Sequence, residues 1–170
     1  DLHGEDVPDW LMKLDTGAHF VRRRNDLFHD PSLGVNDATF SLSENAGEEL
    51  ALSPWLWPIK MSSPERAVLE AMAEVPGAVS FHTMDTVFEA LVGLRPRLVS
   101  QLLGQCRSVK VKRLFLVYAE KHAHPWRKHV DISELDLGRG DRSLLSGGRL
   151  HPTYRITVPV DLIPRETSDA

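Results

Sequence analysis

The chain is poor in the features that mark membrane-spanning, secreted and cysteine-rich proteins. It has one cysteine in 170 residues, which excludes a disulfide framework and a zinc site built from cysteines alone. Its longest uninterrupted apolar run, Leu114 to Ala119, has six residues, whereas a membrane-spanning helix needs about 20. The acidic start, Asp1 to Asp9, is not followed by the apolar core of a secretory signal. We therefore expect a cytoplasmic protein whose hydrophobic core folds without cross-links.

Residue patterns that support catalysis or metal binding are also scarce. His122 and His124 would project about 200° apart on a helix, so they cannot share an ion unless Pro125 breaks the helix between them. Cys106 follows the apolar period of its helix, which favours an inert buried thiol. The sequence has no nucleophile–base or paired-carboxylate pattern that a known mechanism requires. We expect no enzymatic activity, no metal and no cofactor.

Glycines gather in the last third of the chain without forming a phosphate-binding motif. Neither Gly138-Arg139-Gly140 nor Gly147-Gly148 matches the strand-to-helix pattern of a nucleotide-binding loop. We interpret these glycines as turn residues that allow positive φ angles. Three neighbouring arginines leave an anion contact open as the alternative: Arg139, Arg142 and Arg149.

Charge is distributed unevenly along the chain. Residues 1–90 carry six basic and 16 acidic residues, a net charge of −10, whereas residues 91–170 carry 14 and eight, a net charge of +6. The densest positive stretch, Arg95 to Lys128, predicts a surface that binds an anionic partner. The alternative is that these residues pair with the acidic half of the same chain. The candidate residues of this surface are Arg95, Arg97, Arg107, Lys110, Lys112, Arg113, Lys121, Arg127 and Lys128.

The hydrophobic period changes from two to about 3.6 near Ser62 and returns to two near Tyr154. This predicts an α+β fold, in which a small, mostly antiparallel sheet is covered by an α-helical layer. The sheet would combine strands at 19–22, at 39–42 and after Pro58 with a closing strand over 154–158. We expect one domain over residues 1–163 and a frayed tail over 164–170. Its parts are strands and loops at 1–61, helices at 62–130, and a loop with the closing strand at 131–163.

Four helices are expected in the central part of the chain. Either Ser62 with Glu65 or Ser63 with Pro64 marks the first helix start. Pro96 begins the third helix, and Ser108 caps the fourth. On the fourth helix we expect the basic side chains to lie off the apolar stripe and to stay in water. They are Lys110, Lys112, Arg113 and Lys121.

A DNA-reading motif is the alternative interpretation of the second and third helices. Only Gly93-Leu94-Arg95 separates them, which is also how a helix-turn-helix begins its second helix. Residues 82–113 would then form the DNA-binding unit of a transcriptional regulator unrelated to toxins. The third helix would present four side chains to the bases: Arg97, Ser100, Gln101 and Gln105. A plain helical hairpin accounts for the same pattern.

Three stretches of sequence follow one another in a recognisable order. The first is Ser63-Pro64-Glu65-Arg66-Ala67, and the second extends from Leu94-Arg95-Pro96 to Lys110-Val111-Lys112-Arg113-Leu114-Phe115-Leu116. The third is Leu137-Gly138-x-Gly140-x-Arg142-Ser143-Leu144 with Gly147-Gly148, followed by Tyr154-x-Ile156-Thr157-Val158-Pro159. Together they resemble the C-terminal domain of the AbiEi-like antitoxins of bacterial type IV toxin–antitoxin systems, well over residues 60–163 and loosely over 1–60.

This resemblance implies an antitoxin domain that counteracts a nucleotidyltransferase-like toxin. It also implies a full-length parent that represses its own operon through an N-terminal winged helix. That winged helix is absent from this chain, so we expect the chain to be the C-terminal domain alone. The implied partners are the cognate toxin and, through the missing domain, operator DNA, with no membrane contact. The basic surface would meet promoter DNA or an RNA substrate of the toxin.

Overall fold

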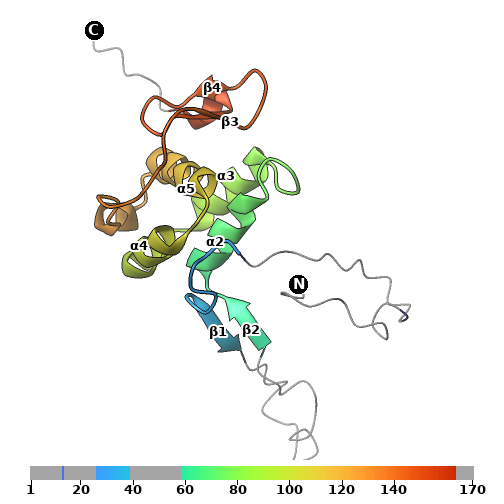
Figure 1. The fold of residues 1–170 in the computed structure, drawn as a ribbon, viewed down its shortest axis with the longest axis vertical. Helices are drawn as coiled ribbons and strands as arrows, with labels where there is room; N and C mark the ends of the chain where they lie inside the picture. Colours follow the sequence, from blue (N-terminus) through green and yellow to red (C-terminus); the bar gives the residue numbers. More distant parts are fainter. Residues whose placement is uncertain (1–12, 14–25, 39–58, 164–170) are drawn as a thin grey trace, which may run out of the picture.

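The computed structural model describes residues 13, 26–38 and 59–163 (Figure 1). The described elements combine four α-helices with short strands, which confirms the predicted α+β class. In chain order they are β1 (Val35–Ala38), β2 (Ile59–Ser62), α2 (Pro64–Ala73), α3 (Phe81–Ala90), α4 (Pro96–Gln105), α5 (Val109–His122), the 3-10 helix η3 (Pro125–His129), β3 (Arg142–Ser143), β4 (Arg149–Leu150), β5 (Ile156–Val158) and the 3-10 helix η4 (Val160–Leu162). The strands expected at 19–22 and 39–42 lie outside the described residues.

The strands form two separate small sheets at opposite ends of the helical body (Figure 1). One is the antiparallel pair β1–β2, in which the described part of β2 covers Ile59 to Ser62 within the stretch where a strand was expected. The other has the order β3-β5-β4, with β3 parallel and β4 antiparallel to β5.

The prediction that the closing strand joins the N-terminal sheet is therefore wrong. The physical reason is that β5 finds both of its partners in the loop directly before it. Its two inward side chains, Ile156 and Val158, are fully buried, so the strand covers its apolar face without reaching the distant hairpin. The strand is also shorter than expected, because Tyr154 lies in the preceding turn.

Local capping decides where the helices begin. The Ser63 hydroxyl accepts a hydrogen bond from the backbone N–H of Arg66, and Pro64 is the first helical residue, so the second of the two predicted starts is correct. Ser108 caps α5 in the same way, through the backbone N–H of Val111. That helix ends at His122, where Ala123 adopts a positive φ of 48° before Pro125.

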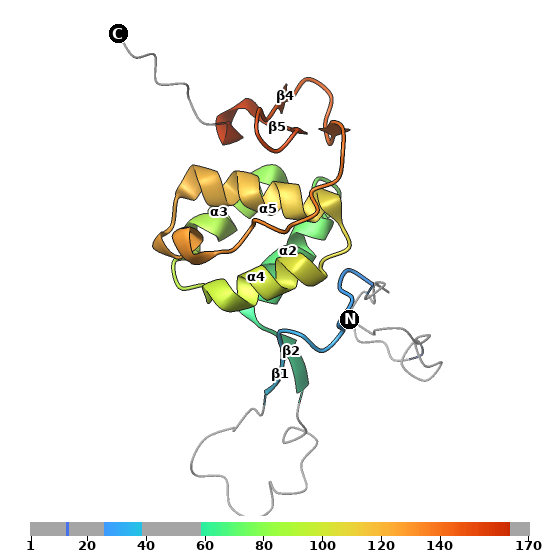
Figure 2. The same ribbon diagram turned by 60° about the vertical axis from the view of Figure 1, so that its left-hand side comes forward.

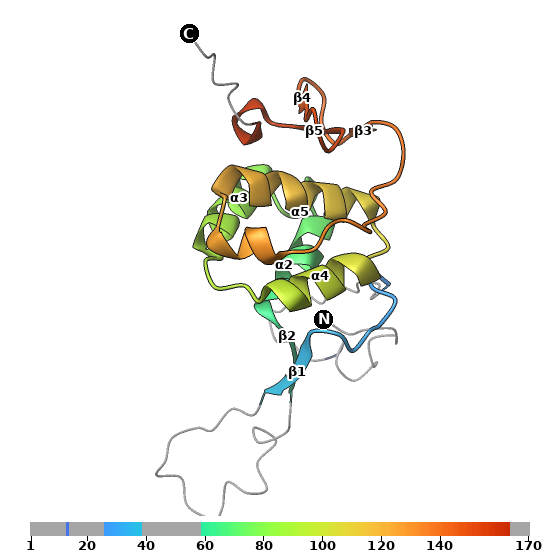
Figure 3. The same ribbon diagram turned by 90° about the vertical axis from the view of Figure 1, so that its left-hand side faces the viewer.

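Helix α5 is the centre of the hydrophobic core. It lies between α4 and the β3–β5–β4 sheet, with α2 and α3 packed behind it (Figures 2 and 3). All nine residues from Val111 to Ala119 are buried. The helix is thus covered all round rather than along one stripe, which determines where its basic side chains go.

Candidate nucleic-acid interface

Two basic residues at the start of α5 do not stay in water, which corrects the expectation from the apolar stripe. Lys112 and Arg113 are only 6% and 3% exposed. The Arg113 guanidinium donates hydrogen bonds to four backbone carbonyls, those of Leu137, Gly138, Gly140 and Arg155, at 2.7–3.1 Å. Burial lowers the pKa of Arg113, and the nearby positive charges of Arg142 and Arg155 act in the same direction. Arg113 thus holds the glycine-rich loop against the helix.

Two further basic residues of α5 are also engaged inside the domain. Lys110 Nζ donates to the carbonyls of Ala73, the last residue of α2, and of Val75 just beyond it, at 2.6 and 2.8 Å. Lys121 Nζ lies 2.7 Å from Asp85 Oδ2 on α3. These cations therefore join α5 to its neighbouring helices, where their charge is balanced by carbonyl or carboxylate oxygens.

The Ser63-Pro64-Glu65-Arg66 motif also serves the fold. Glu65 is only 2% exposed, and its carboxylate accepts two hydrogen bonds from the Arg95 guanidinium and one from the Arg95 backbone N–H, at 2.9–3.0 Å. Burial alone would raise the pKa of Glu65, but these hydrogen bonds prevail and lower it to about 2. The pair joins the start of α2 to the start of α4.

Arg66 anchors the segment that precedes β1. Its buried guanidinium donates to the carbonyls of Pro31 and Leu33 at 2.9 and 2.7 Å, and its Nε donates to Glu70 at 2.7 Å. The guanidinium carbon also lies 4.7 Å from the centre of the Phe28 ring, in cation–π geometry. The signal that could have revealed Arg66 and Arg113 is their position inside apolar helical stretches.

Arg127 belongs to a half-buried polar group between η3, α5 and the turn before β5. Its Nη2 donates to the Tyr154 hydroxyl at 3.3 Å, and the Tyr154 ring stacks on His151 at 4.9 Å. His151 Nε2 faces the Glu120 carboxylate at 3.9 Å. Burial lowers the pKa of His151, and Glu120 acts in the opposite direction.

After these pairings, the predicted basic residues that stay exposed lie on α4, at its two ends and on η3. Of the nine predicted residues, Arg97, Arg107 and Lys128 keep exposed side chains, and Arg95 is 60% exposed although it is paired with Glu65. Arg107 donates to His29 Nδ1 at 3.3 Å and remains exposed. The predicted nine-residue surface is thus divided by the fold into internal anchors and a smaller exposed set.

Helices α3 and α4, the two elements of the alternative helix-turn-helix, pack mainly on different neighbours. Among the described elements, α3 packs mainly on α5, whereas α4 packs on α2 and η3. Ser100, one of the four expected base-reading residues, donates its hydroxyl to Pro96 O and accepts the Asp131 backbone N–H. Three of the four nevertheless remain exposed: Arg97, Gln101 and Gln105.

The glycine-rich loop contains turns, as predicted. Gly138, Gly140 and Gly147 have φ angles of 66°, 72° and 79°, which side-chain-bearing residues rarely adopt. The three arginines expected near these turns are exposed: Arg139, Arg142 and Arg149. A fourth exposed arginine, Arg155, forms an ion pair with Asp141 at 2.7 Å. This loop thus carries a second basic surface, separate from α4.

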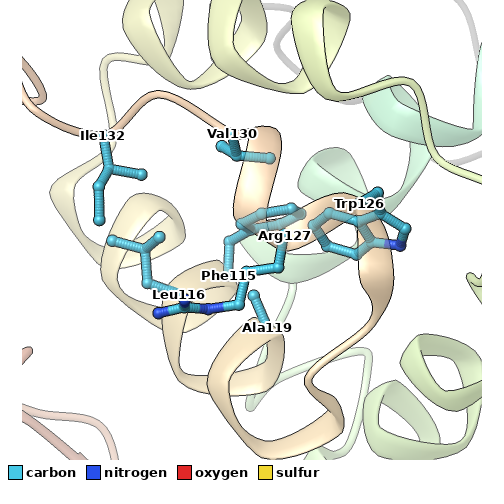
Figure 4. Close-up of a pocket in the computed structure, with 7 residues that line it drawn as sticks. All are labelled: Phe115, Leu116, Ala119, Trp126, Arg127, Val130 and Ile132. Atoms are coloured by element: carbon cyan, nitrogen blue, oxygen red, sulfur yellow. The ribbon is translucent and has the colours of Figure 1, made fainter.

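Two cavities lined by described residues differ greatly in size. The pocket in Figure 4 lies between α5 and η3, is lined mainly by apolar side chains with Arg127 among them, and has a volume of about 40 Å³. That is space for about one water molecule. A cleft of about 340 Å³ lies between the β1–β2 hairpin and α2. Its polar groups are engaged with one another, since Glu70 accepts from both Ser62 and Arg66.

The histidine pair is used in packing. His122 Nε2 lies 2.8 Å from Asp85 Oδ1, and His124 Nε2 lies 2.8 Å from the carbonyl oxygen of Phe88. Within the described ranges, no three His, Cys, Asp or Glu side chains are grouped so that they could hold a metal ion. None of the described helices is both long enough and apolar enough to cross a membrane.

The described residues form a small α+β fold that is held together in part by buried arginine–carbonyl contacts. Residues 2–159 match the family model described as "Transcriptional regulator, AbiEi antitoxin, Type IV TA system", and the chain belongs to this family of AbiEi antitoxins. No curated protein and no solved structure matches the chain. The match confirms the resemblance to AbiEi antitoxins and includes most of residues 1–60, whereas the placement of the chain as their C-terminal domain stays a prediction.

Proposed function

We propose that, within its full-length parent, this domain counteracts a nucleotidyltransferase-like toxin while another part of the parent binds operator DNA and represses the operon. The family match over residues 2–159 is the observation that carries this proposal. The contacts of the motif residues agree with it: Glu65 binds Arg95, and Arg66 and Arg113 each bind backbone carbonyls, so these side chains hold the fold together. The domain would act by binding, without chemistry of its own.

The anionic partner in this proposal meets the exposed basic residues on and beside α4: Arg97, Arg107 and Lys128. Contacts of this kind are made to phosphates and are independent of sequence. Three neutralised phosphates on a duplex give a log–log salt slope of about −2.7, and we expect a dissociation constant of roughly 10⁻⁴ to 10⁻⁶ M at physiological salt.

Co-expression with the cognate toxin tests the antitoxin role. We expect cells that express the toxin to grow when the full-length parent is present, and to stop growing when residues 62–170 are deleted from it. A deleted parent that still protects the cells would contradict the proposal. If even the intact parent gives no protection, the chain is a DNA-binding regulator unrelated to toxins.

Charge reversal tests the anion-binding surface separately. We expect the double variant Arg97→Glu, Arg107→Glu to elute from a heparin or nucleic-acid column at lower salt than the unmodified chain. The variant Arg139→Glu, Arg149→Glu changes net charge equally in the glycine-rich loop, and serves as the control. Equal losses in both double variants would show a general charge effect and would contradict a surface confined to α4.

A further inference from the structure

The cleft between the β1–β2 hairpin and α2 has the size of a small-molecule site. Its volume is about 340 Å³, and such sites in proteins have volumes of about 300–1,000 Å³. Its walls come from three parts of the chain, which are the turn at Pro31 and Ser32, the hairpin, and α2. Val35 pairs with Ser62 across the hairpin, so both side chains point to the cleft. Met61 points the other way and is 44% exposed, so only one face of the hairpin lines the cleft.

The wall of the cleft on α2 is held in place by the protein itself. Arg66 is 1% exposed, and its guanidinium donates to the carbonyls of Pro31 and Leu33 at 2.9 and 2.7 Å. The Glu70 carboxylate accepts the Arg66 Nε–H at 2.7 Å and the Ser62 hydroxyl at 2.8 Å, so it is fixed from two sides. A ligand that meets groups already fixed in this way does not have to order them, which lowers the free-energy cost of binding.

Hydrogen-bond acceptors are available beside α2. The Ser62 hydroxyl donates its one proton to Glu70 and keeps its own lone pairs for a ligand. Ser32 does the same with Asp30, at 2.7 Å. Each carboxylate oxygen of Glu70 accepts one of the two bonds from Ser62 and Arg66 and has a further lone pair, and the side chain is 32% exposed. Several acceptors on one wall suit an ammonium group, which has three protons to donate.

A cation lines the hairpin side of the same cleft. Lys60 precedes Ser62 by two residues on β2, about 7 Å along the strand, and lies on the same face. Its Nζ lies 2.6 Å from Asp37 Oδ1, but the two side chains are 73% and 53% exposed. An ion pair as open as this contributes little to stability, so Lys60 can exchange Asp37 for a carboxylate in the cleft. The charges of the site balance, since two cations are matched by two carboxylates: Lys60, Arg66, Asp37 and Glu70.

We propose that this cleft binds a free α-amino acid. The ammonium group of the ligand donates to Glu70 and to the Ser62 hydroxyl, and its carboxylate accepts from Lys60. Pro31 and Val35 provide apolar contact for the side chain of the ligand. A ligand with charge of one sign would satisfy only one end of this site, whereas a zwitterion satisfies both. Binding joins the hairpin to α2 and is independent of the anion-binding surface on α4.

The first test is thermal unfolding of the full 170-residue chain with each of the twenty standard L-amino acids at 10 mM. At ten times its dissociation constant, a ligand raises the melting temperature of a chain of this size by about 3–6 °C. We expect at least one amino acid to raise it by about 3 °C or more. A panel in which no amino acid does so overturns the proposal.

Analogues of the amino acid that binds separate its two charged groups without changing the protein. One analogue is the carboxylic acid that lacks the amino group, and the other is the amine that lacks the carboxylate. Each should bind at least tenfold more weakly in isothermal titration calorimetry, because it satisfies one end of the site only. An analogue that binds as tightly as the amino acid overturns the proposal.

Lys60→Gln tests the carboxylate contact from the side of the protein. We expect at least a tenfold loss of affinity and an unchanged melting temperature without ligand, because Lys60 is 73% exposed. Lys128→Gln removes an exposed lysine from η3 and is the matched control, in which affinity should stay within twofold. Glu70→Gln should also lower the affinity at least tenfold. Affinity within twofold of the unmodified chain in Lys60→Gln would contradict the assigned contact and overturn the proposal.

Hydrogen exchange locates the bound amino acid. The ligand contacts β2 and α2, so amides of the β1–β2 hairpin should exchange at least threefold more slowly when it is bound. Exchange in the β3–β5–β4 sheet should stay the same, because that sheet lies at the opposite end of the helical body (Figure 1). Unchanged exchange in the hairpin, or slower exchange confined to other elements, would overturn the proposal even if the amino acid binds.

Discussion

Replacing Glu65 by glutamine tests how the start of α2 is joined to the start of α4. The change keeps the volume of the side chain but removes the charge that accepts three hydrogen bonds from Arg95. The new amide group would also present N–H donors to a guanidinium that has only donors. Glu65 is buried, so water cannot replace the lost acceptor.

The size of the effect follows from the pKa of Glu65. Lowering of this pKa from 4.5 to about 2 corresponds to about 3 kcal/mol in favour of the ionised folded state, at about 1.4 kcal/mol for each tenfold change. Because Arg95 is 60% exposed, water screens the pair, and we reduce the expected loss of stability to about 2 kcal/mol. For a chain of this size that loss lowers the melting temperature by about 4–8 °C.

The lowered pKa of Glu65 also predicts how the loss of stability depends on pH. The folded pKa lies below the unfolded one, so the stabilisation is complete above about pH 4.5 and is lost as the pH falls towards 2. We therefore expect the difference in melting temperature between the unmodified chain and Glu65→Gln to be large at pH 7 and less than half as large at pH 3. Glu89→Gln, on the exposed side of α3, is the control. A Glu65→Gln variant that melts like this control at pH 7 would refute the reasoning.

Three further predictions concern the interior. In the variant Arg113→Lys, the lysine ammonium cannot bind all four carbonyls that the guanidinium binds. We therefore expect amide hydrogen exchange in the β3–β5–β4 sheet to become at least tenfold faster. Unchanged exchange rates would contradict the role of Arg113 as an anchor. Burial lowers the pKa of His151 below 6.5, so the folded protein should lose stability as the pH falls through 6.5. In His151→Gln, the melting temperature should change less between pH 7.5 and 5.5 than in the unmodified chain. Equal pH dependence of the two melting temperatures would contradict this role of His151. Tyr118→Phe removes the hydroxyl that donates to the Phe81 carbonyl at 2.8 Å. We expect the free energy of unfolding, measured in urea, to fall by about 1–2 kcal/mol. An unchanged value would show that water replaces the hydroxyl.

Much of the helical part could be predicted because its signals are local. Ser63, Pro96 and Ser108 mark helix starts through the backbone groups of the next few residues, and the structure places all three at those positions. Capping and proline geometry act within one helical turn, so they do not depend on how distant parts of the chain pack. The family resemblance in the motif residues was likewise visible in the sequence and is confirmed by the match.

The candidate site was predicted only in part, because the sequence shows charge but not solvent exposure. All nine basic residues between Arg95 and Lys128 look equivalent on a charge plot. In the structure, Lys110 and Arg113 donate hydrogen bonds to backbone carbonyls, whereas Arg97 and Arg107 stay exposed. Which cation is buried depends on which distant backbone carbonyls arrive beside it, and that is a property of packing.

The sequence by itself determined the α+β class, the order of the helices and the charge difference between the two halves of the chain. These depend on hydrophobic period, local capping and composition, all of which act over a few residues. Tertiary structure alone decided that β5 pairs with β3 and β4 rather than with the hairpin, and that Arg113 crosses to the loop at Leu137. The Arg113 contacts join residues 24 to 42 positions apart, and the partner of β5 depends on the burial of a whole sheet, so in both cases packing outweighs local preference.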